Sequence, residues 1–279
     1  MSSSIPCREC HRPIQRHWES CTFCGAAAFP NVNMADAEVA ALQARADQAL
    51  LNAAPGAPVQ AFRDQVATHS RAIVNVDVGF LHSFFVQKRG LYNTYQQQVA
   101  AQSRSPAAFE NDRRRTAVES LLFGSYGGKL VYAALSLDGG GLPSYGGCAL
   151  QLAEAAIERR SSLLEENSFF FVDRHGVSPT KTAPPGYQAT WPRRGELAQA
   201  KLAPRLKART TAAEFPAILL KSEGERATDD FLEVYIYGVF DHTAVEAIKV
   251  EKSPTEPADR LLLQACAEQA EKVEIPWKD

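Results

Sequence analysis

Four cysteines within the first 24 residues constrain this chain more than any other feature. Cys7 and Cys10 form one Cys-x-x-Cys pair, and Cys21 and Cys24 form a second pair after ten intervening residues. Two such turns supply four tetrahedral thiolate ligands, which is the set that a structural zinc ion requires. Gly25 follows the last cysteine and suits a tight turn whose backbone amides point back at sulfur. The sequence therefore predicts a closed, structural Zn²⁺ site.

The loop between the two pairs leaves its role open. His11 and His17 lie there, but four thiolates already complete a tetrahedral shell, so we expect both histidines to be exposed. The knuckle can be a clip that only stabilises the fold, since metal binding here becomes folding free energy. It can also dock nucleic acid or a partner protein. The residues available for docking are Arg8, Arg12, Arg16 and Trp18.

Composition indicates a globular protein without a general affinity for polyanions. Hydrophobic residues make up 45% of the 279 residues and charged residues 22%, while the formal net charge is −2. Such a charge gives no overall positive field to attract nucleic acid or an anionic membrane. Apolar runs are too short to span a bilayer and the start, MSSSIPCREC, lacks an apolar signal core, so we expect a cytoplasmic protein. The two isolated cysteines, Cys148 and Cys266, are expected to be buried apolar side chains.

The apolar and turn patterns predict an α+β chain in three parts. Residues 1–30 form the zinc ribbon or knuckle, 31–70 a helical hairpin that links it onward, and 71–279 a mixed body. The proline-rich segment Val177–Leu206 is predicted to be a long surface loop. Strands are expected at Ala72–Val76, Leu130–Leu137, Cys148–Leu152, Ala217–Lys221 and Phe231–Tyr237. Helices are expected at Phe80–Gln87, Asp112–Phe123 and Ala258–Glu271.

Three stretches of the body carry the pattern of a known superfamily. They read RRRTAVESLLFGSYGGKLVY (Arg113–Tyr132), SYGGCALQL running into ERRSSLLEENSF (Ser144–Leu152 and Glu158–Phe169), and FLEVYIYGVFDHTAVEAIKV (Phe231–Val250). In that order, and over about half of the chain, they resemble an uncharacterised bacterial group within the ADP-ribosyltransferase superfamily.

The resemblance implies a split β-sheet body that transfers ADP-ribose from NAD to a macromolecular target, protein or nucleic acid, or hydrolyses NAD. Enzymes of this kind are frequently toxins or phage-defence effectors. Breaking the nicotinamide–ribose bond builds positive charge on the ribose, and a carboxylate held nearby stabilises it.

Glu233 is the candidate for that carboxylate. It shares one face of an alternating strand with Tyr235 and Tyr237, and an aromatic ring is a natural stacking partner for nicotinamide. The superfamily usually supplies an Arg or His upstream that grips the NAD. This chain has no clear equivalent in Arg89–Val99, where Asn93 or Tyr95 could serve, or His82 before it. The NAD-binding residues that the resemblance implies are Tyr132, Ser161, Ser162, Tyr235, Arg160 and Asn93.

Plain structural roles stand beside these hypotheses. Glu233 can instead be a solvent-facing residue of an edge strand, and Arg160 a surface salt-bridge partner. Glu165 and Glu166 read as a solvated loop, or one of them as a second acid. The alternative function is a zinc-dependent module that binds nucleic acid or protein, with a non-catalytic body.

Overall fold

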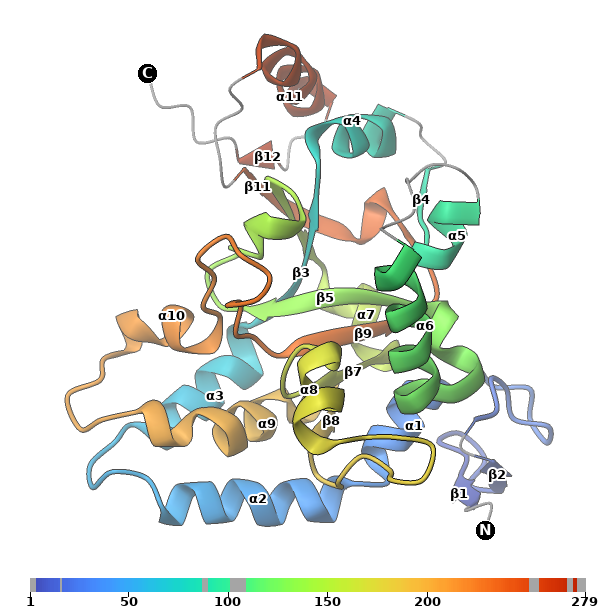
Figure 1. Ribbon diagram of the computed structural model, residues 1–279, viewed down its shortest axis with the longest axis vertical. Coiled ribbons are helices and arrows are strands. Elements are labelled where there is room, and N and C mark those ends of the chain that lie inside the picture. Colours follow the sequence, from blue (N-terminus) through green and yellow to red (C-terminus); the bar gives the residue numbers. More distant parts are fainter. Residues whose placement is uncertain are drawn as a thin grey trace.

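A large antiparallel sheet organises the protein. A computed structural model describes residues 4–15, 17–86, 90–100, 109–250, 256–269 and 273–274. Its described part is a mixed α+β structure, as expected, with helices around an eight-stranded sheet (Figure 1). The helices are α1 (Pro30–Asp36), α2 (Val39–Leu51), α3 (Val59–His69), α4 (Val78–Val86), α5 (Tyr95–Ala100), α6 (Phe109–Phe123), α7 (Glu154–Ile157), α8 (Ser168–His175), α9 (Arg194–Leu202), α10 (Phe215–Leu219) and α11 (Pro257–Gln269).

The main sheet has the order β12-β11-β6-β3-β5-β9-β7-β8, and only its β11–β12 pair is parallel. Two small sheets, β1-β2 and β10-β4, stand apart from it. The strands are β1 (Ser4–Pro6), β2 (Pro13–Gln15), β3 (Arg71–Val76), β4 (Leu91–Tyr92), β5 (Leu130–Ser136), β6 (Cys148–Leu152), β7 (Ser161–Leu164), β8 (Gln188–Thr190), β9 (Glu233–Tyr237), β10 (Phe240–Asp241), β11 (Val245–Val250) and β12 (Val273–Glu274).

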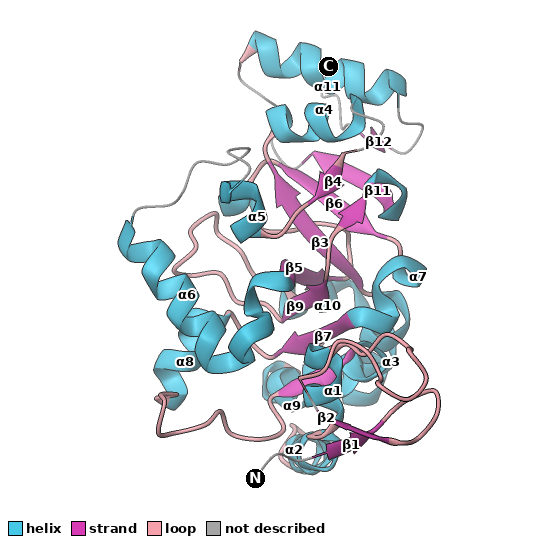
Figure 2. Cartoon of the chain, turned by 90° about the vertical axis from the view of Figure 1, so that its right-hand side faces the viewer, coloured by secondary structure: helices cyan, strands magenta, loops and turns pink. Residues whose placement is uncertain are grey.

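The sheet forks between two of its central strands. β3 pairs with β5 only from Arg71 to Ile73, where Ile73 meets Ala134. Beyond that point β3 continues beside β6, while β5 continues beside β9. Figure 2 shows the result, with β3, β6 and β11 in one group of strands and β5, β9 and β7 in another. Strands that part in this way open space between side chains that a regular sheet would pack together.

The strands beside the fork are buried on both faces. In β9, Val234 and Ile236 belong to the main core, and Tyr235 belongs to a second apolar cluster on the opposite face. This is the period-2 alternation that the sequence of β9 predicts. The two isolated cysteines, Cys148 and Cys266, are fully buried in the main core, as expected.

The segment Val177–Leu206 is not a surface loop, so that prediction was wrong. It contains β8 and α9, and Trp191 and Leu197 are almost completely buried. Pro192 lies in the first turn of a short 3₁₀ helix, where a missing N–H costs nothing. Two prolines in this segment therefore lie at the starts of short helices, where they do not disrupt the hydrogen bonding of the helix.

The strand predicted at Ala217–Lys221 is also wrong, because Phe215–Leu219 forms α10. A capping box between Thr211 and Glu214 starts the preceding 3₁₀ turn, and Pro216 occupies the first turn of the helix. These local signals favour a helix start over the β-propensity of the apolar run that follows.

The segment 31–70, predicted as a helical linker, folds onto the body. Helices α2 and α3 both pack against α9, and Leu42, Phe62 and Val66 lie in the main core (Figure 1). The cysteine-containing segment before them has its own small apolar cluster around Ile14 and Ala28. Within the described residues, no helix is both long enough and apolar enough to cross a membrane.

Candidate functional site

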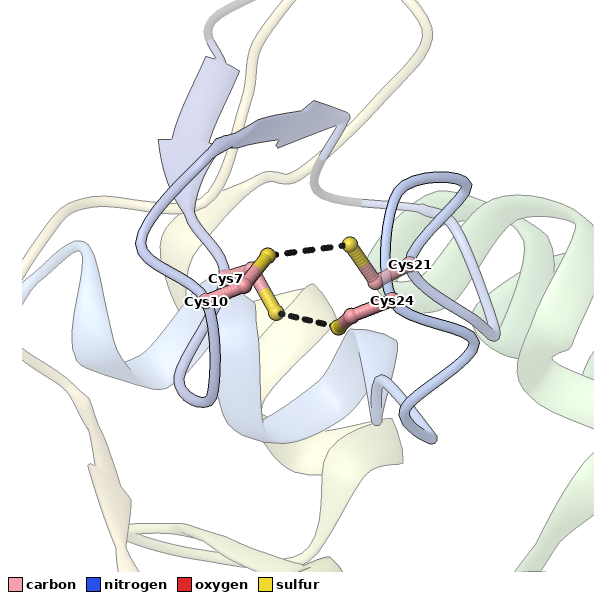
Figure 3. A group of neighbouring side chains, drawn as sticks. All are labelled: Cys7, Cys10, Cys21 and Cys24. Carbon is pink, nitrogen blue, oxygen red and sulfur yellow. Dashed lines mark hydrogen bonds between the residues drawn. The ribbon is translucent and has the colours of Figure 1, made fainter.

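The four N-terminal cysteines come together in space, as their spacing predicts. Figure 3 shows Cys7 and Cys10 facing Cys21 and Cys24 across a gap. The Cys7 and Cys24 sulfurs are 3.8 Å apart, and the Cys10 and Cys21 sulfurs 3.6 Å apart. Four sulfurs at about 2.3 Å from a tetrahedral zinc ion lie about 3.8 Å from each other, whereas a disulfide needs about 2.05 Å. The arrangement therefore fits one metal ion bound by four cysteines.

Backbone amides stabilise the thiolates on both turns. Hydrogen bonds from the backbone N–H groups of Cys10 and Glu9 lower the pKa of Cys7. Burial opposes ionisation of Cys21, but the N–H groups of Phe23 and Cys24 lower its pKa to about 6. Gly25 takes a positive φ of 71° at the end of the second turn, which suits glycine. These contacts favour the thiolates of Cys7 and Cys21. At Cys24 the Ala26 N–H lowers the pKa, but burial and the neighbouring cysteines outweigh it and raise the pKa to about 12.

The other residues of the knuckle do not form a basic patch among its described positions. His11 and His17 are exposed and lie outside the cysteine cluster. The Arg8 guanidinium is 3.7 Å from Asp36, and Arg12 lies over the Phe23 ring. Trp18 packs against the small cluster of the knuckle, and Arg16 lies outside the described residues.

A pocket lies at the fork of the main sheet. Strands β3 and β5 form its floor, and α5, α6 and the start of α8 contribute its walls. Polar groups and aromatic rings both line it. Among the lining residues are Asn93, Arg115, Glu119, Tyr132, Phe169 and Glu233.

Glu233 lies in this pocket and is only 6% exposed. Its strand β9 is paired on both sides, with β5 and with β7, so Glu233 is not on an edge strand. The Ser168 backbone N–H and the Tyr235 hydroxyl both donate to its Oε2, at 2.8 Å each. Burial raises the pKa of Glu233, and these two donors oppose that rise. The carboxylate is therefore held in one position between apolar surroundings and two donors.

The start of α8 explains why an amide faces Glu233. The Asn167 side chain accepts the Phe169 N–H at 3.0 Å and so caps the helix. The N–H of Ser168, the first helical residue, is left for the carboxylate. A helix N-terminus carries a partial positive charge, which favours an anion at this point.

Glu119 is a second buried carboxylate in the pocket, and it was not predicted. It projects from α6 and is 4% exposed, and it accepts from the Tyr132 hydroxyl at 3.0 Å and from Gln96 at 2.9 Å. Burial raises its pKa, although Tyr132, Arg115 and Gln96 oppose the rise. Burial also raises the pKa of Tyr132 well above its ordinary value, and the nearby Glu119 adds to that effect. Tyr132 therefore stays a hydrogen-bond donor.

Arg115 also lines the pocket, one helical turn before Glu119 on α6. Its guanidinium lies 4.4 Å from the Tyr95 ring centroid, 5.7 Å from that of Tyr132 and 5.9 Å from that of Phe169. Such stacking holds a guanidinium in place while leaving its N–H groups for a ligand. On another wall, Gln98 donates to the Asn93 carbonyl at 2.7 Å and fixes Asn93 beside the pocket.

Of the predicted NAD-binding residues, the structure brings Tyr132 and Asn93 into the pocket with Glu233. Tyr235 is fully buried beneath it and reaches the site through its hydrogen bond to Glu233.

The remaining three predicted residues have structural partners elsewhere. Arg160 donates to the carbonyls of Tyr237 and Val239. Ser161 and Ser162 are fully buried, and their hydroxyls bond to Ile157 and Asn31 respectively.

Glu165 and Glu166 do not form a solvated loop, which corrects that interpretation. Their exposed fractions are 7% and 5%, and each carboxylate bonds to an arginine.

Glu119 and Arg115 were not predicted as site residues, because they lie four residues apart on one helix. This spacing normally indicates a surface ion pair. The available signal was the two apolar residues on either side of that face, Val118 and Leu122, which are buried. Neither a protein-family model nor a curated protein matches this sequence.

Proposed function

We propose that the pocket at the fork binds NAD and cleaves its nicotinamide–ribose bond, so that the protein transfers ADP-ribose to a macromolecule or to water. One observation carries the proposal. Glu233, a buried carboxylate fixed by two donors, lines a pocket between the two central strands that part. The resemblance in sequence names the same residue independently.

The charges of the pocket suit a ligand that is both cationic and anionic. NAD carries a positively charged aromatic ring at one end and a diphosphate in the middle. Glu119, Glu233 and the tyrosine rings favour the cationic ring, because carboxylates and aromatic faces both attract a cation. Arg115 is suited to the diphosphate, since a guanidinium binds phosphate oxygens in pairs.

In the proposed step, the bond between ribose C1′ and the nicotinamide nitrogen breaks, and its electron pair neutralises the nicotinamide. The ribose gains oxocarbenium character, which Glu233 stabilises through Oε1, because the Ser168 N–H and the Tyr235 hydroxyl both donate to Oε2. The acceptor then attacks C1′ and gives up its proton. We assign the proton to Glu119, which burial makes a stronger base than an exposed carboxylate.

The test is release of nicotinamide from NAD by the purified chain. We expect Glu233→Gln to lose about 10²–10³-fold in rate, the usual cost of removing one preorganised electrostatic contact. Glu225→Gln is the matched control, because Glu225 is exposed and does not line the pocket. Equal rates in the Glu233→Gln variant and the parent, or no release by the parent, would overturn the proposal.

The ion at the four cysteines is proposed to be Zn²⁺. The donor set is four sulfurs, the soft and closed set that structural zinc prefers, and the sulfur separations match its tetrahedron. A closed shell leaves no position for a substrate, so this ion has a structural role.

A further inference from the structure

A second cluster of metal-ligand side chains lies outside the pocket. Glu165 and Glu166 follow β7, and His175 ends α8 (yellow in Figure 1). One ligand atom from each of the three lies within 4.8 Å of the other two. The cluster combines two carboxylates with an imidazole and is separate from the four cysteines.

Two atoms of this cluster are buried without a hydrogen-bond partner. Glu166 Oε1 and His175 Nε2 have none among the described residues, and the Glu166 side chain is only 7% exposed. A buried polar atom that loses its water without a new partner costs roughly 1–3 kcal/mol, and more when the group is charged. Both orphaned atoms belong to the same small cluster, so one ligand can satisfy both.

Two neighbouring arginines each contact one carboxylate oxygen of the cluster. Arg45 bonds to Glu165 Oε2 at 2.6 Å, and Arg174 bonds to Glu166 Oε2 at 3.0 Å. Each arginine therefore takes the Oε2 atom of its carboxylate, which is the role of outer-shell donors that orient metal ligands.

Packing holds the imidazole in place. The His175 ring lies 4.5 Å from the Phe171 ring and 4.7 Å from the Tyr187 ring. The Arg45 guanidinium carbon lies 3.4 Å from the Tyr187 ring centroid, so His175 and Arg45 both pack against Tyr187. A rigid ligand of this kind favours binding because little side-chain freedom is lost.

We infer that Glu165, Glu166 and His175 bind a divalent first-row transition ion, such as Mn²⁺ or Zn²⁺. One nitrogen and two carboxylate oxygens are the donors these ions accept, and water completes the shell. The Arg174 side chain, which bonds to Glu166, is 63% exposed, so the cluster lies next to the protein surface. The ion would link Glu166, just before α8, to His175 at its end. Glu166 is two residues before Ser168, whose backbone N–H donates to Glu233.

The test is Mn²⁺ titration of the full chain carrying one equivalent of Zn²⁺, followed by the electron paramagnetic resonance signal of free Mn²⁺. Mn²⁺ is used because it binds oxygen and nitrogen ligands and competes poorly for thiolates. We expect one Mn²⁺ per chain, with affinity reduced at least about tenfold in Glu166→Gln and in His175→Ala. His69→Ala and Glu225→Gln are controls, since both residues are exposed and outside the cluster.

A measurement on the parent chain avoids reliance on folded variants. In protein labelled at histidine, Mn²⁺ should broaden the ring signals of His175 before those of His69. Absence of Mn²⁺ binding, binding that both cluster variants retain in full, or broadening of other histidines first would each overturn the inference. A closed network of arginine–glutamate pairs would then account for the cluster.

Discussion

Glu119 and Glu233 are buried carboxylates that lower the stability of the folded protein. A carboxylate loses hydration when it is buried, and both side chains are at least nine-tenths buried in the pocket. Each has donors that recover part of this cost but do not abolish it, since the pKa of each remains raised. Such groups are typical of sites where charge serves a reaction.

Substituting Glu119 by Gln should therefore stabilise the protein, and more so at high pH. The pKa of Glu119 is raised by folding, so the folded state holds its proton more tightly than the unfolded state. The stability contributed by this proton is present at low pH and is lost as pH rises through the folded pKa. We expect a gain in unfolding free energy at pH 8, where burial of the ionised carboxylate is costly, and little gain at pH 4.5.

Urea unfolding of parent and Glu119→Gln at the two pH values measures this difference. The exposed Glu225→Gln should show no such trend. A gain that is the same at both pH values, or larger at pH 4.5, would contradict the role of burial.

The sequence pattern singled out Glu233 but not Glu119, and the difference has a physical reason. Glu233 lies on a strand whose alternation fixes which side chains share its face, so its neighbour Tyr235 could be predicted. Glu119 lies on a helix whose inner face meets a packed core, through Val118 and Leu122, and also the pocket. Helical spacing alone cannot distinguish a buried acid beside a cavity from a solvated one.

Among the elements, the strands next to the fork were predicted well, but the segment Val177–Leu206 was not. Strands β3, β5, β6 and β9 each overlap an expected strand, because their apolar runs are short, β-branched or alternating. The fork itself has no local signature, since it depends on which strand pairs with which. Helix α9 was missed because prolines around it suggested a loop.

The contact between α3 and α9 offers a direct test of that packing. Gly195 lies in α9, where a Cβ atom would come within 2.5 Å of the Arg63 carbonyl oxygen and 3.0 Å of Ala67 Cβ. We expect Gly195→Ala to lower the unfolding free energy by about 1–3 kcal/mol, as overpacking does.

Gly79→Ala is the matched helical control. Nothing lies within 4 Å of a Cβ atom at Gly79, so the stability should stay the same or rise, by up to about 1 kcal/mol. Urea midpoints of the two variants decide the matter. If Gly195→Ala is as stable as Gly79→Ala, the close approach of α9 to α3 is wrong.

At the scale of the whole molecule, the knuckle and the body have separate cores. Exposed ion pairs join them, between Glu9 and Arg159 and between Glu19 and Lys129, together with the ring contact of Phe29 with Tyr237. Exposed ion pairs contribute about 0–1 kcal/mol each, so we expect the stability of the body to depend little on the knuckle.

Removing the cysteine site should therefore unfold the knuckle alone. In a variant with Cys21→Ser and Cys24→Ser, we expect bound zinc to fall by one ion per chain, because two of the four ligands are lost. The urea midpoint of the body should change little. Metal analysis and circular dichroism measure the two quantities, and loss of the cooperative unfolding of the body would contradict this view.

We propose that Glu233 acts on the transition state of NAD cleavage and not on NAD binding. Calorimetry gives the Kd of NAD for the parent and for Glu233→Gln, and nicotinamide release is then compared at equal NAD occupancy. We expect Kd values within about threefold of each other and a release rate lower by about 10²-fold or more in the variant. Equal release at equal occupancy, or a parent chain that neither binds nor cleaves NAD, would contradict it.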